Sequence, residues 1–124
     1  MDTVSSIIVA GLVFVVIFAS GYWLSRAGKP YSVIVLTAHK LISLAAVVLL
    51  VIVMIRSNRV AALSAVELIA GVVTGLFLLA LMATGGLLSV DRQMPAIVLK
   101  LHQIAPYLTL VAAAVTLYLL QSRG

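Results

Sequence analysis

The chain contains four apolar stretches that are each long enough to cross a membrane as a helix, and only short polar segments separate them. A helix needs about 20 mostly apolar residues to span the hydrocarbon core of a bilayer. The four stretches are Val4 to Leu24, Val33 to Ile55, Ala65 to Leu88 and Ala96 to Leu120. Connections this short join antiparallel neighbours. The sequence therefore predicts an all-α integral membrane protein, an up-down-up-down four-helix bundle that forms a single domain over residues 1–124.

The composition excludes a water-soluble domain. Of the 124 residues, 65% are hydrophobic and only 9% are charged, whereas soluble domains are about 45–50% apolar and about 25% charged. Membrane lipid is therefore the expected surrounding. The chain has no cysteine, which excludes disulfides, iron–sulfur clusters and covalently attached c-type haem. Any redox chemistry would need a noncovalent cofactor.

Lysine and arginine lie at the chain ends, in the loops and near the helix ends rather than in one run, so we do not expect nucleic acid as a partner. The first and third loops, with the helix ends beside them, carry more positive charge than the opposite face. The larger group is Arg26, Lys29, Lys40, Arg92 and Lys100, and the smaller group is Arg56, Arg59 and Arg123. Positive residues favour the cytoplasmic side. We therefore expect both termini outside, in a bacterial or archaeal cytoplasmic membrane.

The two histidines of the chain, His39 and His102, both fall inside predicted spans. Ionisable residues are costly there and invite a functional explanation. His39 lies about eight residues into the second span and His102 about six into the fourth, which at about 1.5 Å per residue places both about 9–12 Å below the same face. The second and fourth helices of such a bundle are parallel and diagonal, so inward imidazoles at this depth would face each other. This arrangement suits a bis-histidine haem. We therefore expect one haem b per chain, with His39 and His102 as its iron ligands.

Small residues near the level of the histidines would leave room for a flat macrocycle. They include residues 19–21 of the first span, Thr84 and Gly85 of the third, and Ser43 on the second. Ser43, Thr84 and Gly85 are therefore included in the predicted haem site. The same small residues also let helices approach closely in lipid, so the pattern permits haem without requiring it.

Two lysines stand close to the histidines in the sequence, Lys40 directly after His39 and Lys100 two residues before His102. Helical side chains lean toward the N-terminus of their helix, so both lysines would extend toward the face of the first and third loops. They are predicted either as counterions of the haem propionates or as anchors that reach the membrane surface. Both interpretations stay open.

Other polar and small residues have simpler explanations. No Cys, Asp or Glu lies at the level of the histidines to complete a tetrahedral site, so haem iron is favoured over zinc or copper. A hydrogen-bonded packing role is the alternative for each histidine. The spacing of Ser64 and Glu67 predicts a capping box at a helix start. Gly71 and Gly75 form a GxxxG pattern, which is a common helix contact and a candidate homodimer face.

The segments around the histidines resemble those of a known group of membrane proteins. Residues 38–44 read AHKLISL and residues 101–108 read LHQIAPYL, which is similar to the histidine phrases of small b-type cytochromes of the cytochrome b-561-like and ferric-reductase-like kind. The resemblance implies an integral membrane haem b protein that moves single electrons and exchanges them with quinone, ascorbate or another redox protein. Many of those proteins hold two haems, whereas two histidines ligate only one.

The main hypothesis is therefore a membrane cytochrome b that relays single electrons, either as an electron carrier or as part of an oxidoreductase. A small dimeric transporter is one alternative, but no acidic residue lies deep in a span to couple cation movement. A noncatalytic subunit that attaches to a larger membrane complex through the GxxxG face is the other.

Overall fold

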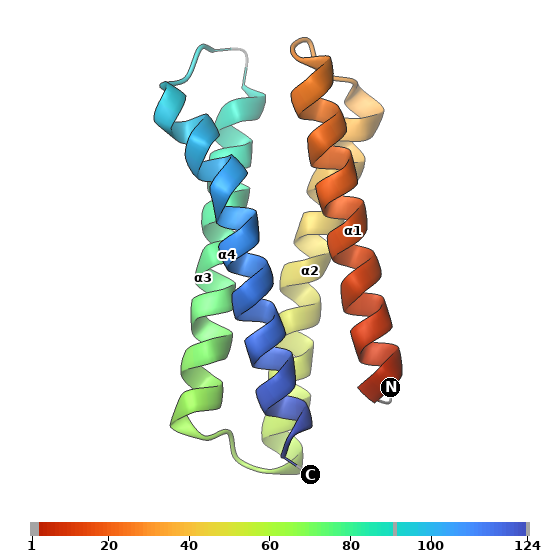
Figure 1. Ribbon diagram of the computed structural model, residues 1–124, viewed down its shortest axis with the longest axis vertical. Coiled ribbons are helices and arrows are strands. Elements are labelled where there is room, and N and C mark those ends of the chain that lie inside the picture. The colour runs from red at the N-terminus through yellow and green to blue at the C-terminus, as the bar shows by residue number, and fades with distance from the viewer. Residues whose placement is uncertain (1–2, 91, 124) are drawn as a thin grey trace. The chain divides into compact units, whose positions relative to one another are not determined.

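The computed structural model describes residues 3–90 and 92–123, and over these residues it contains four α-helices and no strand (Figure 1). The helices are α1 (Thr3–Ala27), α2 (Val33–Val60), α3 (Ala65–Ser89) and α4 (Ala96–Gln121). All four are long and apolar enough to cross a membrane. The predicted all-α class with four membrane-spanning helices is confirmed, and the chain is consistent with an integral membrane protein.

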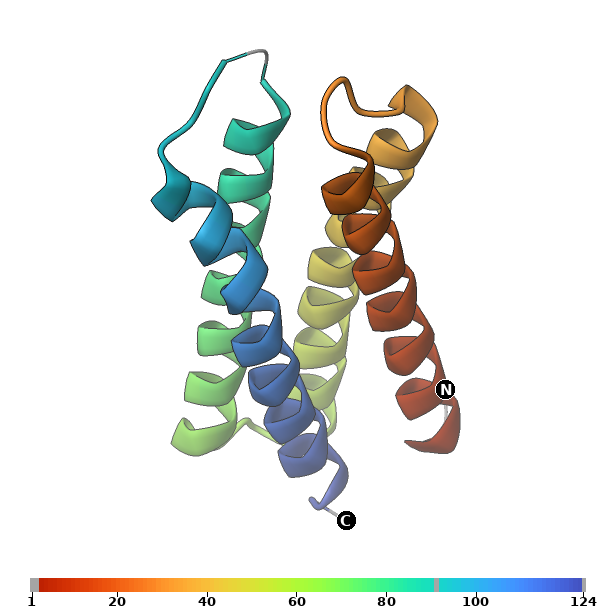
Figure 2. The same ribbon diagram turned by 45° about the horizontal axis from the view of Figure 1, so that its top comes forward.

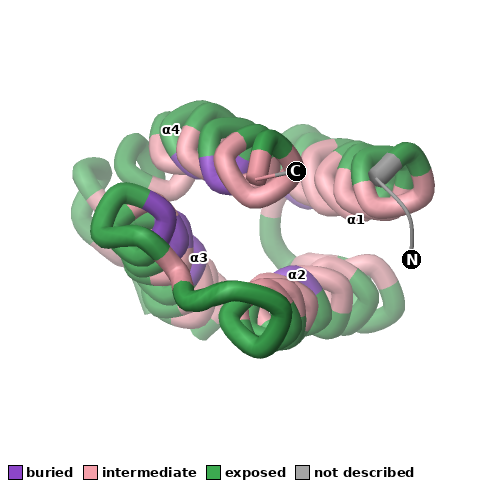
Figure 3. The backbone as a smooth tube through the Cα atoms, turned by 90° about the horizontal axis from the view of Figure 1, so that it is seen from below, coloured by how far each residue is buried: buried purple, intermediate pink, exposed green. Residues whose placement is uncertain are grey.

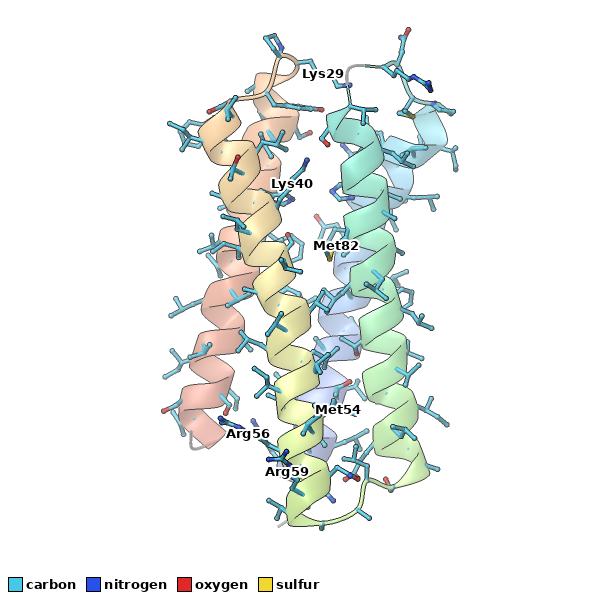
Figure 4. The ribbon with its side chains drawn as sticks, turned by 180° about the vertical axis from the view of Figure 1, so that it is seen from behind. Lys29, Lys40, Met54, Arg56, Arg59 and Met82 are labelled. Atoms are coloured by element: carbon cyan, nitrogen blue, oxygen red, sulfur yellow. The ribbon has the colours of Figure 1, made fainter. Side chains whose placement is uncertain are left out.

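The second helix ends later than its sequence predicts. The residues from Arg56 to Arg59 are expected as a loop, but α2 continues through them to Val60. Arginine is a good helix former, and positive charge near the C-terminus of a helix interacts favourably with the helix dipole. Figure 4 shows both arginines at this end of α2. The connection to α3 is therefore limited to residues 61–64.

Local signals account for two of the other helix ends. Helix α1 stops at Gly28, which has a φ of 71° and whose N–H donates to the Leu24 carbonyl at 3.1 Å. Glycine takes this left-handed conformation at little cost. Helix α3 begins with the predicted capping box: the Ser64 hydroxyl accepts the Glu67 N–H at 3.2 Å, and the Glu67 carboxylate accepts the Ser64 N–H at 2.8 Å. This part of the prediction is confirmed.

The chain divides into two compact units, Met1–Ala46 and Val47–Gly124, with the boundary inside α2. In the first unit α1 runs antiparallel to the first half of α2. The second unit contains the second half of α2, α3 and α4, and Figures 1 and 2 show α3 and α4 side by side. That the whole chain forms a single domain stays a prediction.

Among the described residues of the second unit, the most deeply buried side chains are threonines, and Leu78 and Glu67 are buried as well. Thr74 and Thr116 are each 1% exposed, and their Oγ1 atoms lie 3.0 Å apart across the contact between α3 and α4. Figure 3 shows buried stretches on both helices. Large apolar side chains such as Ile69 and Leu76 are exposed instead. This distribution is typical of helices that associate in lipid, where small and hydroxyl residues form the contacts.

The GxxxG glycines contact α2 of the same chain. A Cβ atom added at Gly71 would collide with the side chain of Met54, and one at Gly75 would lie 3.7 Å from Leu50 Cδ2. Figure 4 shows Met54 on the second half of α2, within the same unit. The close approach that GxxxG permits is therefore used inside the chain, between α2 and α3, and docking of a second copy or a larger complex through this face stays a prediction.

Arg123 connects the residues after α4 to the α2–α3 connection. Its Nε lies 3.1 Å from Glu67 Oε1, its Nη1 donates to the Ser57 carbonyl at 2.9 Å, and its Nη2 donates to the carbonyls of Ala61 and Ala62. The Ser57 carbonyl also accepts the Ala61 N–H at 3.1 Å, so the guanidinium is its second partner, whereas Ala61 and Ala62 lie just after the end of α2. Glu67 is thus both a helix cap and an ion-pair partner.

Candidate functional site

His39 belongs to the first unit, where its imidazole lies against α1. The Nδ1 atom of the ring is 2.8 Å from the hydroxyl oxygen of Ser20. The residue is half-buried. The antiparallel hairpin of α1 and α2 brings Ser20, near the end of α1, to the level of His39, near the start of α2.

Gly21 allows the ring of His39 to approach the backbone of α1. A Cβ atom at this position would lie only 3.1 Å from His39 Cε1 and 3.8 Å from Nδ1, closer at Cε1 than an ordinary van der Waals contact. Any larger residue would push the imidazole away from the helix. Ser20 therefore provides the hydrogen-bond partner of the ring, and Gly21, which has no side chain, leaves room for the ring beside α1.

His102 belongs to the second unit and has the same surroundings. Its Nδ1 atom is 2.8 Å from Thr84 Oγ1, and a Cβ atom at Gly85 would lie 2.9 Å from His102 Cε1. Real Cβ atoms essentially never come so close to another atom. The ring is half-buried and is held against α3 as the ring of His39 is held against α1.

The two histidine environments match in each component. A hydroxyl residue holds Nδ1, a glycine follows it directly, and the histidine stands 19 or 18 residues further along the chain on the next helix. A histidine that only fills space needs neither the same partner atom nor the same glycine contact in both units. The repetition indicates that the orientation of the ring matters at both positions.

The other residues of the predicted haem site have different positions. Ser43 donates its hydroxyl proton to the backbone carbonyl of His39 at 2.7 Å, so it contacts the helix rather than the ring. Lys40 and Lys100 are exposed, and Figure 4 shows Lys40 on the first half of α2. Thr84 and Gly85, which belong to the predicted haem site, are direct neighbours of the imidazole of His102.

Sequence reasoning gave Ser20 and Gly21 no individual role. Their only signal is the Ser-Gly pair in the first span, at the estimated level of His39, which corresponds to the Thr-Gly pair at residues 84 and 85. A comparison of the two hairpins in the sequence could have found it.

The donor set restricts which metal the chain could hold. Among the described residues there is no group of three or more His, Cys, Asp or Glu side chains that could hold a metal ion. Zinc sites usually take three or four protein ligands, whereas haem iron is bound by the porphyrin and takes only its axial ligands from the protein. In each of the two units the imidazole has one nitrogen, Nδ1, held by a hydroxyl of the neighbouring helix.

Comparison of the chain with protein-family models, with curated proteins and with solved structures finds no match. The resemblance of the two histidine segments to b-type cytochromes therefore stays a prediction. The functional assignment depends on the chemistry of the residues themselves.

Proposed function

We propose that this protein is a membrane cytochrome b that binds one haem b through His39 and His102 and relays single electrons. The observation that carries the proposal is the repeated histidine environment, in which a hydroxyl holds Nδ1 and a glycine admits the ring. Histidines that bind metals almost always donate a hydrogen bond from the nitrogen that does not bind the metal. Iron ligation would then fall to Nε2 of each ring.

The remaining parts of the proposal follow from charge and surroundings. When bound, haem supplies a one-electron iron couple, and the protein supplies two axial ligands and a low dielectric. Lys40 and Lys100 are the candidate counterions for the propionates. We place the first and third loops in the cytoplasm and both termini outside. A membrane quinone or another redox protein is the proposed exchange partner, because such partners can reach a haem that lies within the bilayer.

The test is the absorption spectrum of the purified full-length protein in detergent, first oxidised and then reduced with dithionite, with haem counted as the pyridine haemochrome. We expect a sharp reduced α-band and close to one haem b per chain. His39→Ala and His102→Ala should each abolish the low-spin spectrum, whereas Gln103→Ala, at an exposed neighbour of His102, should leave it unchanged. A protein that stays colourless after haem supplementation, or an unchanged spectrum in both histidine variants, would refute the proposal.

A further inference from the structure

The hydroxyls of Ser20 and Thr84 each have only one proton, and the backbone of their own helix accepts it. Ser20 Oγ lies 2.7 Å from the Val16 carbonyl, and Thr84 Oγ1 lies 2.9 Å from the Ala80 carbonyl. A carbonyl oxygen can only accept a hydrogen bond. Each hydroxyl is therefore the donor in the bond to its own helix and has no second proton to give.

The imidazole must then be the donor in the bond between ring and hydroxyl. Nδ1 lies 2.8 Å from the hydroxyl oxygen in both His39 and His102. An unprotonated Nδ1 at this distance would face the lone pairs of an oxygen whose proton points elsewhere, which is repulsive. Nδ1 therefore carries the proton, and a neutral imidazole with this tautomer has its lone pair on Nε2.

We infer that Ser20 and Thr84 are the positioning residues of the two proposed iron ligands. Each hydroxyl fixes both the tautomer and the rotation of its imidazole, so that Nε2 would have its lone pair available to bind the iron. The role toward iron rests on the proposed function. The two tautomers follow from the hydrogen bonds alone and can be measured without haem.

The hydroxyls should also influence the reduction potential of the bound haem. A hydrogen bond donated from the second ring nitrogen raises the basicity of a metal-binding imidazole, which favours ferric over ferrous iron. A hydroxyl is a neutral acceptor and does this less strongly than a carboxylate would. Loss of either hydroxyl should therefore shift the midpoint potential upward.

The first experiment measures the tautomers in the haem-free full-length protein. With ¹⁵N-labelled histidine at alkaline pH, two-bond proton–nitrogen correlations distinguish an Nδ1–H ring from an Nε2–H ring. We expect Nδ1–H at both histidines. Ser20→Ala and Thr84→Val should each give a mixture at the partner histidine, whereas Ser20→Thr and Thr84→Ser should keep the single tautomer. Thr109→Val is the matched control, because Thr109 also donates to its own helix, to the Ala105 carbonyl at 2.8 Å.

The second experiment measures haem affinity and midpoint potential in the same variants. Removal of a residue that supports a metal ligand typically weakens binding about 10- to 100-fold, so we expect this loss in Ser20→Ala and Thr84→Val, with rescue by the hydroxyl-retaining variants. Circular dichroism checks that each variant is folded, and Thr84→Ala replaces Thr84→Val if that variant does not fold.

The outcomes separate this inference from the proposed function. An Nε2–H tautomer at either histidine of the wild type overturns the inference even if haem binds. Unchanged haem affinity and potential in both Ser20→Ala and Thr84→Val overturn the positioning role while the cytochrome assignment stands. Nδ1–H tautomers in a protein that never binds haem refute the cytochrome assignment and the role toward iron, and they leave the hydrogen-bond assignment intact.

Discussion

Arg123 should stabilise the second unit measurably, and Arg123→Met tests this while keeping an apolar side chain of similar length. The change removes the ion pair with Glu67 and the hydrogen bonds to the carbonyls of Ser57, Ala61 and Ala62. Breaking one partner of a buried pair costs about 3–5 kcal/mol. The Arg123 side chain is 19% exposed and that of Glu67 10%, and Glu67 keeps its bond to the capping backbone, so we expect a loss somewhat smaller than this range, about 2–4 kcal/mol.

The assay is reversible unfolding in mixed micelles, with the free energy of unfolding compared between variants. Arg59→Met is the matched control, because Arg59 is exposed in the last turn of α2 and exposed substitutions usually change stability by less than about 0.5 kcal/mol. Glu67→Gln completes a double-mutant cycle, since its amide oxygen can still accept the Ser64 N–H. We expect Arg123 and Glu67 to be coupled by about 1–2 kcal/mol.

Two results would refute this reasoning. If Arg123→Met is as stable as Arg59→Met, the guanidinium contributes nothing to the fold. If the double variant equals the sum of the two single variants, the bond between Arg123 and Glu67 is not the source of the stability.

Two further predictions concern close contacts in the second unit. Gly85→Ala should displace the ring of His102 and raise the dissociation constant of the proposed haem about 10- to 100-fold. Gly86→Ala is the control, because a Cβ atom at Gly86 meets nothing within 4 Å. A haem titration that gives the two variants the same dissociation constant would contradict this prediction. Thr74→Val and Thr116→Val should each lower the free energy of unfolding by only about 0.6 kcal/mol, because the two hydroxyls have two protons for three contacts. A loss above about 2 kcal/mol in micelle unfolding would show that this estimate is wrong.

Hydropathy predicts the helices well because span length depends on a bilayer thickness that the sequence must match. It fails at the end of α2 for a physical reason. The polar segment from Arg56 to Arg59 looks like a loop in a hydropathy pattern, but polarity alone does not end a helix. There the guanidinium of Arg123, 66 residues away from Ser57, donates to the carbonyls of Ser57, Ala61 and Ala62. No local window of the sequence contains that contact.

The candidate site could be predicted only in part because hydropathy does not determine how a helix is rotated about its axis. A span that is apolar on all sides gives no preferred face, and successive residues point about 100° apart. The depth of His39 could be estimated by counting, but which neighbour on α1 touches its ring could not. The GxxxG pattern has the same limit, since its spacing predicts a close helix contact without naming the partner helix.

The choice of hydroxyls beside both histidines follows from the cost of polarity in lipid. A carboxylate would hold an imidazole N–H more strongly, but an acidic residue within a span is costly, up to about 2.5–3.5 kcal/mol on insertion when it lies at the centre of the helix. Serine and threonine avoid this cost, because their own proton goes to a carbonyl of the same helix while an oxygen lone pair stays available to the ring. A glycine directly after the hydroxyl lets the ring come close enough to use that lone pair. The Ser-Gly and Thr-Gly pairs are therefore a low-cost way to fix the orientation of an imidazole inside a membrane without burying a charge.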